Sequence, residues 1–228
     1  MNDLLNNAHV RAGLYFTDQG HYLLAVKGRN NEKEVTTKTL RDAEVRAAFT
    51  RAGQDSGWMM PGVIRKGNNA LGPWYVYLCM ATLQKVTIKG SGRMVIPLPG
   101  LVMVGAGDHH YLFAVDIKDA GKFNPSALVL CQAPFPNVHS DGKICWGNNQ
   151  APRVDAGSAQ QARDLFFESP FNADLTKDKS RKYPADCRMM LAELDLKDVY
   201  PVKDLVKLHQ ASTLEERLKQ IVGDMEAE

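Results

Sequence analysis

The chain has 228 residues, of which 44% are hydrophobic and 24% charged, and a formal net charge of +2. This is the composition of an ordinary folded protein, and the length suits one elaborated domain better than two independent ones. Lys and Arg are scattered among Asp and Glu, which excludes the basic stripe of a nucleic-acid binder. No apolar run is long enough to cross a membrane. We therefore expect neither a nucleic-acid nor a membrane partner.

Cysteine and histidine spacings argue against a metal site. No two cysteines form a C-x-x-C pair, and the six histidines do not stand at zinc-ligand spacings. The first residues lack the basic and apolar regions of a secretory signal, so we expect a cytoplasmic protein. In that compartment cysteines remain free thiols. They are Cys79, Cys131, Cys145 and Cys187.

The first seventy residues predict a β-hairpin and a helix that elaborate the core. Apolar runs at residues 11–17 and 21–27 flank a Gly-containing turn, as in a hairpin. Thr39 stands as an N-cap before apolar residues at helical spacing, which predicts a helix over residues 40–52. Residues 53–72 are rich in Gly, Asn and Pro and are expected to form a loop.

Short β-branched and aromatic runs follow, separated by turn residues. This spacing predicts an antiparallel meander, with one more extended piece at residues 126–131. The runs are residues 74–80, 85–89, 101–104 and 111–115, and the turns are residues 89–92, 97–100 and 105–108.

Two helices complete the chain. Asp155 or Ser158 can cap a helix whose apolar face is Ala159, Ala162, Leu165 and Phe166, and Ser169-Pro170 ends it. After a polar connector at residues 177–183, Ser212 and Glu215 form a capping box for a second helix. Its apolar stripe suits the core or, alternatively, a partner protein. The order of elements predicts an α+β fold with a core over residues 71–176 and a connector plus C-terminal helix over residues 177–228.

Residues 133–149 combine backbone-breaking and apolar residues. Pro134, Pro136 and Gly142 exclude a regular helix or a central strand. An irregular segment that also carries apolar side chains must pack against a core, so we expect a shaped surface rather than a mobile loop. These apolar residues are Phe135, Val138, Ile144 and Trp146.

Cys145 is the candidate nucleophile of this segment. Glycines on both sides let another molecule approach the backbone closely, as a thiol that receives a bulky acyl group requires. Lys143 could favour the thiolate, and the Asn137 amide could donate to a developing oxyanion. Alternatively, Cys145 is a small buried hydrophobe. Asn137 could also hold the backbone of the loop, a role compatible with the first.

His139 and Asp141 are auxiliary candidates. His139 could act as a general base for Cys145 or simply face solvent. Asp141 could be an acid, but Asp-Gly is typical of a tight turn. We expect the other three cysteines to be structural or incidental.

The segment resembles the active-site segment of ubiquitin-conjugating (E2) enzymes. That family has a His-Pro-Asn motif, a turn with glycine, and a catalytic Cys eight positions after the Asn. Here Pro136-Asn137, Gly142, Ile144 and Cys145 stand at these positions, and Phe135 replaces the His, which supports the loop in that family. The string Ala-Pro-Phe-x-Asn-Val…Asp-Gly-x-Ile-Cys-x-Gly is more closely similar to protein B of the PRTRC cassettes. These prokaryotic E2-like proteins are encoded on bacterial plasmids and integrative elements.

The resemblance covers about residues 97–174, including the flanking strands and the helix after the cysteine. It implies an E2-like α+β fold, an antiparallel β-meander packed with helices, with an extra N-terminal hairpin and C-terminal helix. The first helix of a eukaryotic E2 is not visible before the meander.

The resemblance also implies an activity. Cys145 would accept a ubiquitin-like protein as a thioester from a ThiF/E1-like activating enzyme and pass it to a lysine amine, with Asn137 at the oxyanion. A JAB-type peptidase of the same cassette would be a further partner, and no metal or organic cofactor is implied. One alternative is an inactive E2-fold module that binds a ubiquitin-like protein or acts as a scaffold. Another is a thiol hydrolase that uses Cys145 and His139.

Overall fold

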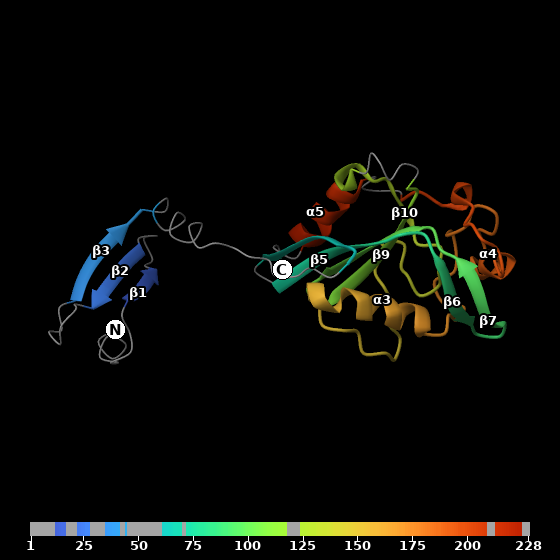
Figure 1. Ribbon diagram of the computed structural model, residues 1–228, viewed down its shortest axis with the longest axis horizontal. Helices are drawn as coiled ribbons and strands as arrows, with labels where there is room; N and C mark the ends of the chain where they lie inside the picture. The colour runs from blue at the N-terminus through green and yellow to red at the C-terminus, as the bar shows by residue number, and fades with distance from the viewer. Residues whose placement is uncertain are drawn as a thin grey trace. The chain divides into compact units, whose positions relative to one another are not determined.

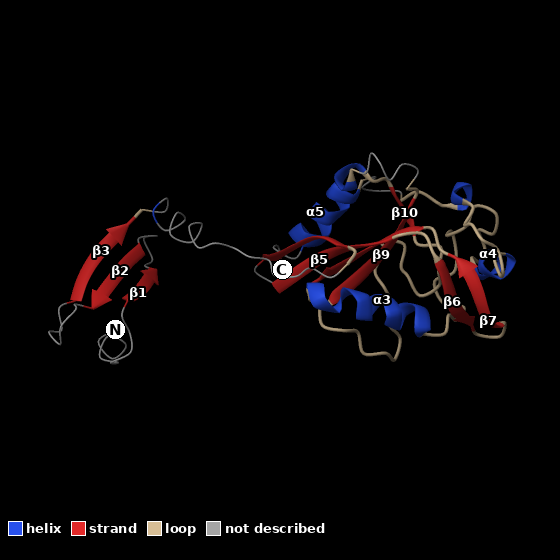
Figure 2. Ribbon diagram, viewed as in Figure 1, coloured by secondary structure: helices blue, strands red, loops and turns tan. Residues whose placement is uncertain are grey.

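A computed structural model describes residues 12–16, 22–27, 35–41, 44, 61–69, 72–117, 124–208 and 213–224 (Figure 1). The chain divides into two compact units, Met1–Gly57 and Trp58–Glu228. Within the described residues the secondary structure is mixed, with antiparallel sheets and few helices (Figure 2). The α+β fold class is therefore confirmed.

The smaller unit contains a three-stranded antiparallel sheet. Its strands are β1 (Ala12–Phe16), β2 (Tyr22–Lys27) and β3 (Val35–Leu40), in the order β1-β2-β3. The predicted hairpin is confirmed by the β1–β2 pairing. The predicted helix is wrong at its start, because Thr39 lies in β3 and pairs with Leu23 of β2. Glu44 is helical, and the remaining residues of the predicted helix beyond Arg41 lie outside the described part.

The larger unit is built on a five-stranded antiparallel sheet in the order β10-β9-β8-β5-β4. A separate hairpin of β6 and β7 is inserted between β5 and β8, so the chain does not follow a plain meander: β6 pairs with β7 instead of β5. The strands are β4 (Val63–Asn69), β5 (Gly72–Cys79), β6 (Leu83–Ile88), β7 (Gly92–Pro97), β8 (Gly100–Ala106), β9 (His109–Val115) and β10 (Leu130–Gln132).

Two expectations for this unit are corrected. The loop predicted at residues 53–72 is wrong over β4, which is an edge strand with β5 as its neighbour in the sheet. An edge strand contacts the core less than a central one, so it tolerates the Lys, Gly and Asn residues that indicated a loop. The extended piece predicted at residues 126–131 is a 3-10 turn, η2 (Pro125–Ala127), followed by β10.

The predicted helix after the irregular segment is confirmed. A 3-10 turn, η3 (Ala156–Ser158), leads into α3 (Ala159–Glu168), and Asp155 caps that turn by accepting a hydrogen bond from the Gly157 N–H. A short helix that the sequence did not indicate, α4 (Arg188–Glu193), and the turn η4 (Val202–Asp204) follow in the C-terminal third.

The C-terminal helix α5 (Leu214–Asp224) is confirmed, but its capping box is shifted by one residue. Thr213 Oγ1 accepts from the Glu216 N–H at 3.3 Å, and Glu216 accepts from the Thr213 N–H at 3.0 Å. Glu215, expected to close the box, instead pairs with Arg65 at 2.6 Å. Ser212 lies outside the described residues.

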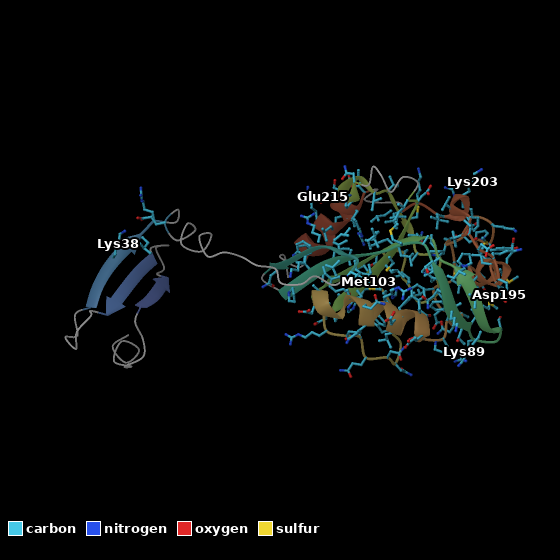
Figure 3. The ribbon with its side chains drawn as sticks, in the orientation of Figure 1. Lys38, Lys89, Met103, Asp195, Lys203 and Glu215 are labelled. Carbon is cyan, nitrogen blue, oxygen red and sulfur yellow. The ribbon has the colours of Figure 1, made fainter. Side chains whose placement is uncertain are left out.

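Helices cover both faces of the sheet, and β8 is therefore buried along its whole length. Successive side chains of a strand point to opposite faces. Leu101 and Met103 belong to the core that includes α3, whereas Val102 and Val104 belong to the core that includes α5. Figure 1 shows α3 and α5 on opposite sides of the sheet. Met103, labelled in Figure 3, is fully buried. None of the helices in the described ranges is long and apolar enough to span a bilayer.

Candidate active site

The irregular segment folds into a short hairpin that brings Asn137 next to Cys145. Val138 and Ile144 form an antiparallel bridge, and the Cys145 N–H donates to the Asn137 carbonyl at 2.8 Å. The turn is closed by the Gly142 N–H, which donates to the His139 carbonyl at 2.9 Å. A short hairpin loop that ends on a residue with positive φ is typical of this geometry. The eight-residue spacing between Asn137 and Cys145 is thus the spacing that pairs them across the hairpin.

Gly142 is the position at which this hairpin requires glycine. Its φ is +90°, and a Cβ there would collide with the ring of Phe113. The close approach lets the hairpin bond to β9: the Leu112 N–H donates to the Gly142 carbonyl, and the Ile144 N–H donates to the His110 carbonyl, both at 2.8 Å. The active-site hairpin is therefore attached to the central sheet.

Asn137 uses its backbone to hold the hairpin and leaves its side chain available. Its φ is +60°, a conformation that Asn tolerates better than most residues. Its N–H donates to the Asp174 carbonyl at 3.1 Å, and its carbonyl accepts from Cys145. The side-chain amide has no hydrogen-bond partner among the described residues. It can therefore donate to a bound molecule.

Asn137, Cys145 and Trp146 line one surface depression of about 340 Å³. The wall consists mainly of neutral hydrogen-bonding groups, and Asp174 contributes the one charged side chain among the described lining residues. The others are Gly147, Asn148, Asn149, Phe166, Ser169, Pro170 and Asn172. Such a surface can hydrogen-bond the backbone of a peptide without requiring it to carry charge.

Cys145 differs from the other cysteines in its accessibility. All four lie in the described part of the chain; Cys145 is exposed, and the other three are buried. Burial raises the pKa of Cys79 to about 11 and that of Cys187 to about 12, and it also raises the pKa of Cys131. Because the thiolate is the reactive form, the buried thiols are poor nucleophiles at neutral pH.

Phe135 anchors the start of the segment in the apolar core. Its ring is fully buried and lies edge-on to Phe167 at a centroid distance of 5.4 Å. It also stacks on Phe171 at 5.9 Å. The residue that replaces the motif histidine therefore holds the loop by packing. Pro136, the next residue, is also buried.

Lys179 is a site residue that the sequence did not reveal. It lies in the predicted polar connector, yet its residue exposure is 2%. Its ammonium donates to the Phe135 carbonyl at 2.8 Å and to the Val138 carbonyl, which bracket Pro136-Asn137. Burial lowers the pKa of Lys179 to about 8. A lysine in a polar run carries no sequence signal for such burial.

Arg217 of α5 holds the other end of the hairpin. Its guanidinium donates to the Asp141 carbonyl at 2.7 Å and lies over the ring of Phe113, 5.9 Å from the centroid. The C-terminal helix thus packs on the core and also contacts the turn of the active-site hairpin. Two cations from distant parts of the chain therefore bind backbone carbonyls of one irregular segment.

The three auxiliary candidates lie on the turn, outside the lining of the depression as far as the described residues show. His139 is exposed, and the Asp141 carboxylate accepts from the Lys143 N–H at 2.9 Å, as in an Asp-Gly turn. Lys143 Nζ lies 3.1 Å from Nε2 of His109. All three are close to Cys145 in the sequence, but in the structure each contacts another residue of the turn or β9.

Trp146 closes the hairpin against a buried histidine. Its indole lies edge-on to His110 at 5.5 Å. Burial lowers the pKa of His110 to about 4, so the imidazole is neutral at physiological pH. Within the described ranges, His, Cys, Asp and Glu side chains form no group of three that could hold a metal ion.

The antiparallel sheet, the few helices and the cysteine-bearing segment after the last strands are those of an E2-like protein. A family profile described as prokaryotic E2 family D matches residues 36–208, and the chain belongs to that family. Searches of curated proteins and of solved structures found no match.

Proposed function

We propose that the protein is an E2-like carrier. It accepts a ubiquitin-like protein as a thioester on Cys145 from a ThiF/E1-like enzyme and passes it to an amine. One observation carries the proposal: in a chain of a prokaryotic E2 family, Cys145 is the exposed thiol, and it shares a depression with the unpaired amide of Asn137.

The proposed first step is an exchange of thioesters. The Cys145 thiolate attacks the carbonyl carbon of the thioester that links the ubiquitin-like C terminus to a cysteine of the activating enzyme. A carbon–sulfur bond to Cys145 forms, the bond to the donor cysteine breaks, and the donor leaves as a thiolate. One thioester replaces another, so the acyl group remains activated.

The proposed second step forms an amide. The lone pair of a lysine amine attacks the same carbonyl, a carbon–nitrogen bond forms, and the bond to Cys145 breaks with release of its thiolate. The nitrogen loses one proton to solvent. Negative charge develops on the carbonyl oxygen as the amine attacks, and the Asn137 amide supplies an N–H donor for it in this step. Asp174, at the wall of the depression, can attract the lysine ammonium before it loses its proton.

The assignment to a PRTRC cassette is also a proposal. The string around Cys145 supports membership of a PRTRC cassette, with a ubiquitin-like protein and a ThiF-type enzyme as partners and a JAB-type peptidase encoded nearby. Four unpaired cysteines support a reducing, cytoplasmic location. Sequencing the neighbouring genes tests this assignment, and a neighbourhood without activating-enzyme and ubiquitin-like genes would contradict it.

The carrier step is tested on a non-reducing gel. Incubation with the activating enzyme, the ubiquitin-like protein and ATP should yield an adduct that a thiol reductant cleaves and that Cys145→Ala abolishes. Cys145→Ser should yield an ester that survives the reductant. Cys131→Ala serves as the matched control and should retain the adduct. A complex that forms equally with Cys145→Ala, without any adduct, would identify a binding module instead.

The transfer step is tested with Asn137→Gly. Glycine accepts the positive φ of residue 137, so the hairpin is retained while the amide is lost. The thioester should still accumulate, and its discharge onto free lysine should slow by about 10²–10³-fold, the effect of removing one oxyanion donor. An unchanged discharge rate would remove Asn137 from the mechanism.

A further inference from the structure

A second groove lies toward the opposite end of β9 from Cys145. The active-site hairpin bonds to His110, at the start of that strand. The second groove is lined by Val115, Asp116 and Ile117, at and beyond its end. Five residues of strand separate His110 from Val115, which corresponds to about 17 Å. The groove is therefore separate from the depression that contains Cys145.

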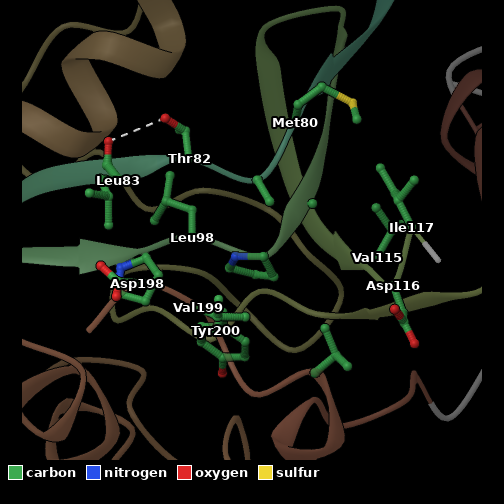
Figure 4. A pocket seen from close by; sticks show the side chains of 15 residues that line it. Met80, Thr82, Leu83, Leu98, Val115, Asp116, Ile117, Asp198, Val199 and Tyr200 are labelled. Carbon is green, nitrogen blue, oxygen red and sulfur yellow. Dashed lines mark hydrogen bonds between the residues drawn. The ribbon is translucent and has the colours of Figure 1, made fainter. Parts of the chain in front are cut away.

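One half of this groove is lined mainly by apolar side chains, several of them exposed, and its two charged residues among those described are Asp116 and Asp198. It has a volume of about 360 Å³. Met80 and Leu83 are 53% and 52% exposed, and Val199 is 77% exposed. Figure 4 shows these three side chains with Leu98 and Tyr200 around the hollow. Exposed apolar side chains gathered in one concave place mark an interaction surface, whereas scattered ones do not.

The other half is cationic. An adjoining depression of about 400 Å³ shares Asp116 and Val202 with the apolar half, so the two lie side by side. It is lined by Arg181, Lys203 and Lys207, all of them exposed. Figure 3 shows Lys203 at the surface. Three cations against Asp116 leave a formal charge of +2 on this half.

The wall between the halves is held rigidly. The buried carboxylate of Asp204 accepts from Ser180 Oγ at 3.0 Å and from the Lys182 N–H at 2.8 Å. The Tyr200 hydroxyl donates to the same carboxylate at 3.4 Å. The Gln132 N–H donates to the Val206 carbonyl at 2.8 Å, which ties this wall to β10. A preformed groove loses little conformational entropy when it binds a ligand.

We infer that this groove binds an extended segment of a partner protein in which apolar residues adjoin Asp or Glu. The apolar side chains enter the half formed by Met80, Leu83 and Val199. The carboxylates face Arg181, Lys203 and Lys207. Charge complementarity selects this occupant, because a neutral or basic segment would leave the cationic half unpaired or repel it. The inference does not depend on Cys145 or on any thioester.

A phage-displayed library of random peptides, selected on the full-length protein, tests the inference. We expect enrichment of peptides with two or more apolar residues next to acidic ones. A fluorescent synthetic copy of an enriched peptide should bind at least about tenfold more weakly to Leu83→Asp and to the double variant Lys203→Glu/Lys207→Glu, a loss of about 1.4 kcal/mol. Thermal melts of each variant separate lost binding from lost folding.

Met189→Asp is the matched control, because Met189 is 56% exposed on α4 and lies outside the groove. It should bind the peptide as the wild type does. Replacing the acidic residues of the peptide by Lys should restore binding to the double charge-reversal variant.

Three results would overturn the inference. They are a selection that enriches no acidic peptides, binding that is indifferent to Leu83→Asp in a folded variant, and a wild-type dimer in sedimentation that Leu83→Asp dissociates. The last result would assign the groove to a second copy of the chain.

Discussion

Replacement of Lys179 by methionine removes a buried ammonium while keeping a long apolar side chain. The ammonium binds the carbonyls of Phe135 and Val138, on either side of Pro136-Asn137. We expect Lys179→Met to loosen the active-site hairpin more than it destabilises the whole protein. The physical reason is that two opposing energies act on this residue.

The unfavourable energy is desolvation. The fall of the pKa from 10.5 to about 8 corresponds to about 3 kcal/mol at 1.36 kcal/mol for each pH unit. The favourable energy is that of two charge-assisted hydrogen bonds, about 1.5–3 kcal/mol each. The free energy of unfolding should therefore change by no more than about 3 kcal/mol. Locally, the two carbonyls lose their donors, and nothing offsets that loss within the hairpin.

The sign of the pH dependence is fixed by the same pKa values. Between about pH 8 and 10.5 the unfolded chain keeps the Lys179 proton that the folded protein has lost. Stability rises with pH wherever the unfolded state binds more protons. Relative to Lys179→Met, the wild type should gain up to about 3 kcal/mol across this range. The nearby Cys187 thiol, with its pKa raised to about 12, stays protonated within this range.

Urea unfolding followed by tryptophan fluorescence, repeated at several pH values, measures this difference. The exposed Lys177 provides the control variant Lys177→Met, which should parallel the wild type. Hydrogen exchange gives the local measurement, since the Cys145 N–H donates to Asn137 inside the hairpin and should exchange faster in Lys179→Met. A stability difference that stays flat with pH, together with unchanged exchange at Cys145, would refute the reasoning.

Three further predictions test the site and the α5 cap. Gly142→Ala should destabilise the protein by more than about 2 kcal/mol, because the new Cβ would collide with Phe113 at a residue whose φ is already positive. Gly147 also has a positive φ but faces open space, so Gly147→Ala should cost only about 1 kcal/mol. Equal losses of stability in urea unfolding would contradict this reasoning. A thiol reagent should modify Cys145 rapidly in the native protein and all four cysteines only after denaturation. Rapid modification of a second cysteine in the native protein would contradict the burial of the other three thiols. Thr213→Ala should lower the free energy of unfolding by about 1 kcal/mol through loss of the α5 cap, and an unaffected urea midpoint would reject that cap.

Short-range features of the fold were predictable. The hairpin of β1 and β2, the helix α3 and the turn at Asp141-Gly142 depend on turn residues and apolar periodicity within a few positions. These signals act between neighbours in the chain, so the sequence displays them directly. One local string, in which Asn137 and Cys145 pair across one hairpin, predicted an E2-like family, and the family profile over residues 36–208 confirms it.

Features that depend on distant partners were not predictable. The strand β4 has little apolar character of its own and forms on β5. The α5 cap lies one residue from the predicted position, within the usual uncertainty of a helix end. Lys179 contacts carbonyls 44 and 41 positions away, and Arg217 contacts one 76 positions away. The sequence pattern of a polar segment does not predict contacts with residues so far away in the chain.

The amino-acid sequence alone determined the chemistry that residues 133–149 can offer: a thiol, an amide eight positions before it, and a turn that sets the two side by side. The tertiary structure decided which of four thiols faces solvent and which lysine is buried beneath the hairpin. The reason is that turn geometry arises from a few adjacent torsion angles, whereas burial depends on every element that packs around a residue.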